Sequence, residues 1–447
     1  MKQRPSWFKS LSVTMIAAAV GLTGCSSGKQ AEQAVVTPQA SSSAATTAPA
    51  SGKAAKLKIM WWGTQARHDA TLKALELYTQ QVPNVTFTPE YTAWDGFWEK
   101  LPTLAASNSI PDVLQMDAAY IQSYVKRGQL ADLSDMDLNG IVDPKILENV
   151  KINGKLYGVP LSLNGQGMVY NKPELEAAGI KLPFNNWTYD DFFAFAKEAR
   201  AKLPKDKYPI DDLTNIWDWY QYYQTAQGKG PIFQDGTKFN LDKDTWFQFQ
   251  NIYAQFRKDG VVPSAEMQLS FKENDPKLDS LAAGKVMMRG ASVGSVGAVE
   301  SLLPGKLVVN SNPIGPKGGG WAQSTIFLSV GANSSNKDQA KQFIKWFVSN
   351  QEAGKVLGTT RGIPINETIF KSIEPTLSKG DLFGKQMLNA AKEKALPFYP
   401  APPGSEDFVK TYKTEMEAVM FGKQTLEQAY TTITEKGKDA EAKLNKK

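Results

Sequence analysis

Two chemically versatile residue types are almost missing from this chain of 447 residues. It contains one cysteine, Cys25, and one histidine, His68. A single cysteine excludes an internal disulfide. A Ser-His-Asp triad or a histidine metal site would have to use His68. No Gly-Lys pair is followed by Ser or Thr, so the sequence has no P-loop motif.

Long apolar runs and concentrated charge are also missing beyond the N-terminus. No later segment approaches the roughly 20 apolar residues of a membrane-spanning helix. The formal net charge is +6, and it falls to +3 when Lys2, Arg4 and Lys9 are removed with the first residues. Because this mild excess forms no basic cluster, we expect no nucleic-acid partner.

Residues 1–24 have the pattern of a secretory signal peptide. Basic residues precede an apolar run from Leu11 to Val20, which is too short to span a bilayer. The run ends in Leu22-Thr23-Gly24-Cys25, which is similar to the lipobox of bacterial lipoproteins. A lipidated Cys25 would anchor the chain to the outside of the cell membrane. The alternative is a plain secretory signal with an incidental cysteine.

Residues 25–56 are expected to form a flexible tether behind the lipidated cysteine. The stretch from Ser26 to Lys56 consists almost wholly of Ala, Ser, Thr, Gln, Lys and Pro. Such a composition buries too little apolar surface to offset its chain entropy. The remaining residues exceed one compact domain.

Strand and helix patterns alternate from residue 57 onward. Leu57 to Trp62, Asn84 to Pro89 and Pro111 to Met116 are predicted as strands, with helices from His68 to Gln81 and from Trp94 to Ala106. This alternation predicts an α/β fold with a largely parallel sheet. Ligands in such folds bind at the carboxyl ends of the strands.

The middle of the chain continues this pattern. Thr188 fits a helix N-cap, with Asp191 placed as in a capping box. An amphipathic helix is predicted from Asp242 to Asp259, and a short strand over 286–288. Aromatic residues are densest over 216–223.

Ordered short motifs along the chain give it a family resemblance. The motifs are Ile110-Pro-Asp-Val113, Gly128-Gln-Leu-Ala-Asp-Leu133, Gly154-Lys-Leu-Tyr-Gly-Val-Pro160, Val169-Tyr-Asn-Lys172, Ala177-Ala-Gly179, Gly284-Lys-Val-Met-Met-Arg-Gly290, Lys341-Gln-Phe-Ile-Lys-Trp-Phe347 and Gly362-Ile-Pro364. Over residues 55–430 the chain resembles family 1 of the extracellular solute-binding proteins, which includes maltose-binding protein.

The resemblance implies two α/β lobes, each assembled from discontinuous segments. The N-terminal lobe would comprise 57–163 and 287–333, and the C-terminal lobe 164–286 and 334–447. Crossovers that act as a hinge would lie near 163–167, 285–290 and 331–337. A ligand would sit between the lobes and favour the closed form, which a membrane permease of an ABC importer would recognise.

Aromatic content favours a carbohydrate as the ligand. The chain has eleven tryptophans and 11% aromatic residues, and indole planes suit the apolar faces of sugar rings. In the N-terminal lobe the candidate contacts are Trp62, Gly63, Trp94 and Asp117, with Asn164 in the first crossover. Trp62, at the end of the first strand, is the favoured aromatic platform, with a core residue as the alternative. Trp94 lies four residues before Trp98 on a helix, a spacing more typical of a core, but it could reach the rim of the cleft. Asp117 could instead be a plain loop or helix-cap residue.

The candidates from the other segments are Trp217, Trp219, Arg289, Trp321 and Arg361. Trp217 and Trp219 occupy the aromatic stretch, and one of them is expected to face the cleft. Trp321 follows three glycines. Arg289 and Arg361 could bind hydroxyls or a carboxylate. A polar or anionic solute is therefore an alternative ligand.

Asp135-Met-Asp137-Leu-Asn139-Gly140 resembles the first half of an EF-hand calcium loop. The twelfth position should be Glu but is Ile146, so we expect a capped surface loop, with calcium as the alternative. No metal or cofactor is expected, and the chain is expected to be a monomer. A secreted glycan-degrading enzyme and a surface adhesin are the other classes that a lipid-anchored, tryptophan-rich chain could represent.

Overall fold

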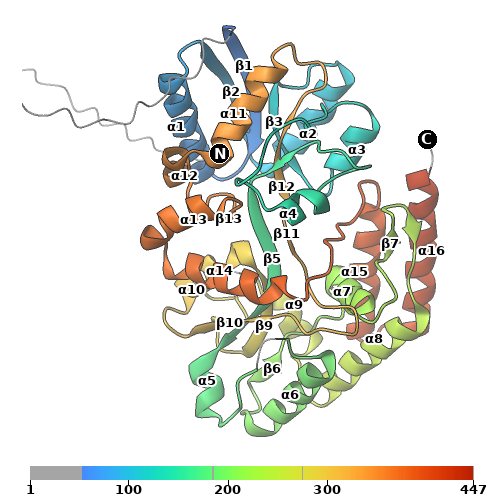
Figure 1. The fold of residues 1–447 in the computed structure, drawn as a ribbon. Coiled ribbons are helices and arrows are strands. Elements are labelled where there is room, and N and C mark those ends of the chain that lie inside the picture. The colour runs from blue at the N-terminus through green and yellow to red at the C-terminus, as the bar shows by residue number, and fades with distance from the viewer. Residues whose placement is uncertain (1–52, 184–185, 274, 446–447) are drawn as a thin grey trace, which may run out of the picture. The chain divides into compact units, whose positions relative to one another are not determined.

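Two β-sheets organise the computed structural model, which describes residues 53–183, 186–273 and 275–445 (Figure 1). All of their strands lie in one unit, Pro49–Lys447. The first sheet has the order β2-β1-β3-β12-β4, and the second β10-β5-β9-β6. Their strands are β1 Ala55–Trp62, β2 Val85–Thr92, β3 Val113–Asp117, β4 Val159–Pro160, β5 Ser162–Asn171, β6 Tyr208–Ile210, β9 Val286–Ser292, β10 Leu307–Ser311 and β12 Ile326–Val330. The predicted signal peptide, Cys25 and residues 25–52 of the tether lie outside the described residues.

Helices pack on both faces of the first sheet, and together they form the first lobe. Alternate side chains of β1 enter two cores. Trp61 packs with Tyr78 of α1 and Phe343 of α11, whereas Trp62 packs with Phe97 of α2. Both tryptophans are buried because neither face of this sheet is open to solvent. The helices of this lobe are α1 Gln65–Gln81, α2 Trp94–Ala106, α3 Ile121–Lys126, α4 Pro144–Asn149, α11 Lys337–Ser349, α12 Gln351–Leu357 and α13 Glu367–Ile373.

The second lobe surrounds the second sheet and has a strongly aromatic core. Helix α14 packs against β5 and β10, and α15 packs beside α16 in the red part of the ribbon (Figure 1). A small hairpin joins β7 Phe233–Gln234 to β8 Lys238–Phe239. The helices of this lobe are α5 Lys172–Ala177, α6 Tyr189–Lys202, α7 Trp217–Ala226, α8 Lys243–Lys258, α9 Ala265–Ser270, α10 Val296–Leu302, α14 Lys379–Lys392, α15 Glu406–Met420 and α16 Leu426–Asn445.

The two-lobed α/β fold expected from the sequence is confirmed, and the sheets differ in strand direction. In the first sheet β1 runs parallel to β2 and β3, as expected, and β12 runs antiparallel to β3 and β4. In the second sheet only β6 and β9 are parallel, because β5 runs antiparallel to both of its neighbours. The second sheet is therefore mixed and not largely parallel.

Crossover segments of the chain lie side by side at the start of β5. Strand β11, Ala322–Gln323, pairs with Gly165 and Asn164, and β13, Ile363–Pro364, pairs with Leu163 and Ser162. The first crossing lies within the expected 163–167. The second lies at β11 and the third follows α13, before α14, and neither lies at 285–290 or 331–337. Residues 285–290 cannot form a crossing because β9 is an inner strand of the second sheet.

These crossings also move the boundaries of the lobes. Strands β9 and β10, within the 287–333 segment expected in the N-terminal lobe, hydrogen-bond to β5 in the second sheet. Helices α11 to α13, expected in the C-terminal lobe as part of 334–447, lie with the first lobe, where Phe343 contacts Tyr78 and Phe87. The sequence pattern predicted helices and strands, but the pairing of the strands determines which lobe each helix or strand belongs to.

No described helix is long and apolar enough to cross a membrane.

Candidate functional site

A cleft of about 750 Å³ lies between the two lobes. We call it the wide cleft. The first lobe lines it with Ala118, Gln122 and Lys126, just after β3 and along α3. The second lobe contributes Phe233 of the β7–β8 hairpin and the proline-rich segment 398–404. Its wall at the carboxyl end of β3 agrees with the strand-end position expected for a ligand site.

A second cavity of about 220 Å³, the hinge pocket, lies beside the crossover strands. Asn164 of β5 lines it, as do Arg67 of the first lobe and Gly294 of the second. The side-chain Oδ1 of Asn164 accepts hydrogen bonds from the backbone N–H groups of Gly165 at 2.9 Å and Gly294 at 3.2 Å. Asn164 thus links the first crossover to the second lobe and has its amide NH₂ left as a donor.

An aromatic cluster stands at the carboxyl ends of β1 and β3. Trp62, only 5% exposed, contacts Trp94 edge to face at 5.2 Å and Trp98 at 5.6 Å between ring centroids. Tyr120 stacks on Trp98 at 3.9 Å and lies 6.1 Å from Trp94. Trp94 itself is 41% exposed. The cluster therefore fixes one exposed indole on a buried aromatic base, with Trp62 as part of that base.

Asp117 is the last residue of β3 and lies next to this cluster. Its Oδ1 accepts a hydrogen bond from the backbone N–H of Ala119 at 2.8 Å. Burial raises the pKa of Asp117 to about 6, against the opposing effect of that hydrogen bond. No cation forms an ion pair with Asp117 in the part of the chain that the structure describes. It is a carboxylate with unused acceptor capacity.

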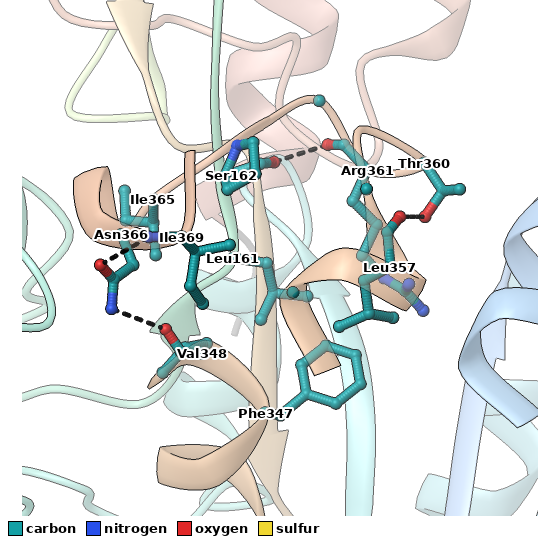
Figure 2. Close-up of a pocket in the computed structure, with 14 residues that line it drawn as sticks. Leu161, Ser162, Phe347, Val348, Leu357, Thr360, Arg361, Ile365, Asn366 and Ile369 are labelled. Atoms are coloured by element: carbon teal, nitrogen blue, oxygen red, sulfur yellow. Dashed lines mark hydrogen bonds between the residues drawn. The ribbon is translucent and has the colours of Figure 1, made fainter. Parts of the chain in front are cut away.

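Arg361 is 8% exposed and lies two residues before β13. Its Nε donates to Oε1 of Gln115 at 2.9 Å and one terminal nitrogen donates to Oγ1 of Thr71 at 2.8 Å. Figure 2 shows its side chain beside Leu357, at an enclosed cavity of about 40 Å³ whose lining is mostly apolar. That cavity is too small for a sugar, but Arg361 also lines the hinge pocket.

A sequence profile of the bacterial extracellular solute-binding proteins matches residues 73–380. The chain belongs to this family.

Individual relatives agree with this membership. A diacetylchitobiose binding protein of Streptomyces coelicolor is 26% identical over 369 residues, which cover 80% of this chain and 82% of that protein. The lipoprotein LipO of Bacillus subtilis is 30% identical over 253 residues, 51% of this chain and 48% of its own. An extracellular solute-binding protein family 1 structure from Alicyclobacillus acidocaldarius superposes with a TM-score of 0.75 at 25% identity, and the match covers 89% of this chain and all of that one.

In this solute-binding protein, the two tryptophans of α7 are half-buried. The ring of Trp217 packs against Phe408 of α15. The ring of Trp219 lies directly on strand β9, because a Cβ placed on Gly290 would be 1.9 Å from its Cζ2 atom. Only glycine at 290 lets the indole approach so closely. Both residues therefore join α7 to neighbouring elements, and each retains some exposed surface.

Arg289 and Trp321, two of the expected ligand contacts, lie inside the second lobe. Arg289 is 2% exposed and forms an ion pair of 2.7 Å with Asp279. Asp279, and not a ligand, therefore meets its guanidinium. Trp321 is 7% exposed and its ring centroid lies 4.5 Å from that of Phe398, so the segment before α15 covers it.

Sequence reasoning missed Arg67 and Phe398, which line the cavities, and Tyr120 of the aromatic cluster. Arg67 lies in the first turn of α1, where its guanidinium donates to the backbone oxygens of Trp62 and Thr360. Gly63 lies against the Arg67 side chain, with 2.4 Å between its notional Cβ and Cδ of Arg67. Phe398 lies in a proline-rich stretch that reads as a linker, and Tyr120 follows β3. Arg67 follows strand β1 and Tyr120 follows strand β3, and this position after a strand was the sequence signal that could have identified them as site residues.

The calcium-like loop serves a different purpose in this structure. Asp135 forms an ion pair with Lys341 at 2.7 Å and Asp137 with Lys345 at 3.2 Å. Both lysines belong to α11, so the two carboxylates attach this helix to the loop. Within the described ranges, no group of three or more His, Cys, Asp or Glu side chains is placed to hold a metal ion.

Proposed function

We propose that this solute-binding protein captures a carbohydrate between its lobes and delivers it to the permease of an ABC importer. The observation that carries the proposal is Trp94, an exposed indole held in place by the buried ring of Trp62 and the half-buried ring of Trp98. A fixed aromatic plane suits the apolar C–H face of a sugar ring. Asp117 beside it supplies acceptors for hydroxyl groups, which form charge-assisted hydrogen bonds.

Binding would be coupled to closure of the lobes. The first two crossings and strand β13 meet at Ser162 to Gly165, so bending there moves one lobe relative to the other. A ligand that contacts both lobes binds the closed form better, and this differential affinity drives closure. Trp94 and Asp117 would act from the first lobe, and Phe398 with Trp217 from the second.

The comparisons support a carbohydrate and an extracytoplasmic position. One relative is named for diacetylchitobiose, which is a sugar. Another is named as a lipoprotein, which agrees with the interpretation of Cys25 as the lipidated residue of a lipobox. We therefore propose a monomer anchored through lipid on Cys25, with the permease as its membrane partner.

The position of His68 argues against a catalytic role for this histidine. Its Nδ1 accepts a hydrogen bond from Nε1 of Trp61 at 3.1 Å, and its ring lies against Tyr91. Burial, followed by the charges of Arg67 and Arg361, lowers the pKa of His68. The ring is thus neutral and committed to packing, which is unsuitable for general acid-base catalysis of a glycan.

Titration calorimetry with a panel of mono- and oligosaccharides tests the proposal. Once a ligand is found, Trp94→Ala is expected to weaken binding by about 1 kcal/mol, or roughly fivefold, because a stacking plane is lost. Trp346→Ala is the matched control, since Trp346 packs on Tyr78 in the first lobe, outside the cavities that we assign to the ligand. Heat signals absent for the whole panel, or equal affinities in the two variants, would overturn it.

A further inference from the structure

Two arginines meet at the hinge pocket from different segments of the chain. Arg67, in the first turn of α1, donates from Nε to the backbone oxygen of Thr360 at 2.9 Å and from a terminal nitrogen to that of Trp62 at 3.1 Å. Arg361 is adjacent in sequence to Thr360. Burial lowers the pKa of Arg361, and the nearby charge of Arg67 lowers it further.

The partners of both arginines are neutral. Arg361 uses Gln115, Thr71 and the ring of Phe347, which lies 5.5 Å from its guanidinium carbon (Figure 2). Its remaining terminal nitrogen is buried and has no hydrogen-bond partner. No carboxylate forms an ion pair with Arg67 or Arg361 anywhere in the described ranges. A buried cation without a counter-ion is costly, and its cost falls when an anion arrives.

The buried Arg289 and the partly buried Arg257 have a different kind of partner, whereas the partly buried Arg200 donates only to backbone oxygens. Arg257 forms an ion pair with Asp212 at 2.6 Å, and Arg289 forms one with Asp279 at 2.7 Å. In both pairs the counter-charge comes from the protein itself. In the hinge pocket, by contrast, the buried guanidinium group of Arg361 has no carboxylate counter-charge from the described residues.

The walls of the hinge pocket leave room beside these charges. Four glycines line it from the second lobe, namely Gly294, Gly297, Gly380 and Gly384. Asn164 lines it with a free amide donor, as described above. The carboxylate of Asp381 also lines it, but that group accepts hydrogen bonds from Thr359 and from the Ser378 N-cap of α14.

We infer that the hinge pocket binds the carboxylate of an acidic sugar, so that the carbohydrate taken by this protein is a uronic acid or an oligomer of one. The inference rests on the proposed function. Two arginines and one aspartate leave one net positive charge, which matches a singly charged carboxylate and not a doubly charged phosphate. Guanidinium groups pair with carboxylates in a forked geometry. Asn164 would donate to the same ligand.

Calorimetry with matched sugar pairs tests this inference. The probes are galacturonate against galactose and glucuronate against glucose, as monosaccharides and as disaccharides. The wild-type protein is expected to bind at least one uronate ten or more times as tightly as its neutral partner. Arg67→Gln should reduce that ratio to about one, and Arg67→Lys should keep part of it. Lys73→Gln, which removes the same charge from an exposed position of α1, should leave the ratio unchanged.

Each outcome separates this inference from the proposed function. Neutral sugars that bind as well as uronates, or a ratio that survives Arg67→Gln in a variant with wild-type circular dichroism, would overturn the inference and leave carbohydrate binding intact. If no sugar of either kind binds, both fail. Sodium acetate and sodium sulfate form a further arm. If acetate or sulfate binds as tightly as the uronate, the pocket binds a free anion, and the inference that its ligand is an acidic sugar is overturned.

Discussion

Arg289 of the second lobe and Arg361 on the first-lobe side are both buried, and they have opposite kinds of partner. In the second lobe, Arg257 and Arg289 each face a carboxylate at hydrogen-bonding distance. On the first-lobe side of the cavities, Arg361 has only neutral partners and Asp117 only a backbone donor. A buried ion pair within the protein stabilises the packing of its own lobe, and neither of its charges is available to a ligand. A charge without a counter-ion beside a cavity is available to a ligand. The presence of an ion pair therefore distinguishes Arg289 from Arg361 better than their positions in the sequence do.

Removal of a paired charge in the second lobe should have the largest effect. Arg289→Met leaves Asp279 buried without its cation, and we expect a loss of about 3–5 kcal/mol in the free energy of unfolding. Urea denaturation followed by circular dichroism measures it. Arg289→Met combined with Asp279→Leu should recover most of the loss, because no uncompensated charge remains. A single variant as stable as wild type would contradict the importance of the pair.

Asp117 should make stability depend on pH on the first-lobe side. Its pKa is raised from 3.8 to about 6 in the folded protein. The folded state therefore holds a proton that the unfolded state has lost, and stability falls as pH rises from about 4 to about 6. A shift of this size corresponds to about 2–3 kcal/mol across that window.

Asp117→Asn should flatten this part of the profile of unfolding free energy against pH. Asp211, whose pKa burial raises to about 7, acts in the same direction and remains in both proteins, so the difference between the two profiles isolates Asp117. Identical slopes between pH 4 and pH 6 would mean that Asp117 is solvated like a surface carboxylate.

Loss of an unpaired charge should have the smallest effect on stability. Arg361→Met removes two hydrogen bonds to neutral groups and leaves no buried ion behind, so we expect a loss of about 1–2 kcal/mol. The same urea experiment measures it. A loss as large as that for Arg289→Met would remove the distinction between the two arginines.

Local structure could be predicted well from the sequence because its causes are local. Helix α2 spans Trp94–Ala106, as expected from periodicity. The Thr188–Asp191 capping box is present at the start of α6. Strand β1 ends at Trp62, as its apolar run indicated. Each of these depends on residues only a few positions apart.

The site could be predicted only in part, because burial depends on distant segments. Trp321 looked free after three glycines, but Phe398 covers it. Arg289 has its counter-charge ten residues earlier, in a stretch with no regular pattern. Asn164 was expected in the first crossover because the family resemblance implied where the chain passes between the lobes, which sequence periodicity does not indicate. Whether these side chains contact a ligand remains a prediction.

The position of β12 has a consequence for the order in which the chain can fold. This strand lies between β3 and β4 in the first sheet, with Ile326 opposite Asp117. During synthesis β1, β2 and β3 emerge early, yet their sheet lacks its inner neighbour until the whole second sheet has been made. Such non-local pairing folds slowly and leaves an unpaired strand edge exposed meanwhile. The first lobe is therefore expected to be the part that needs protection from aggregation until residue 330 is available.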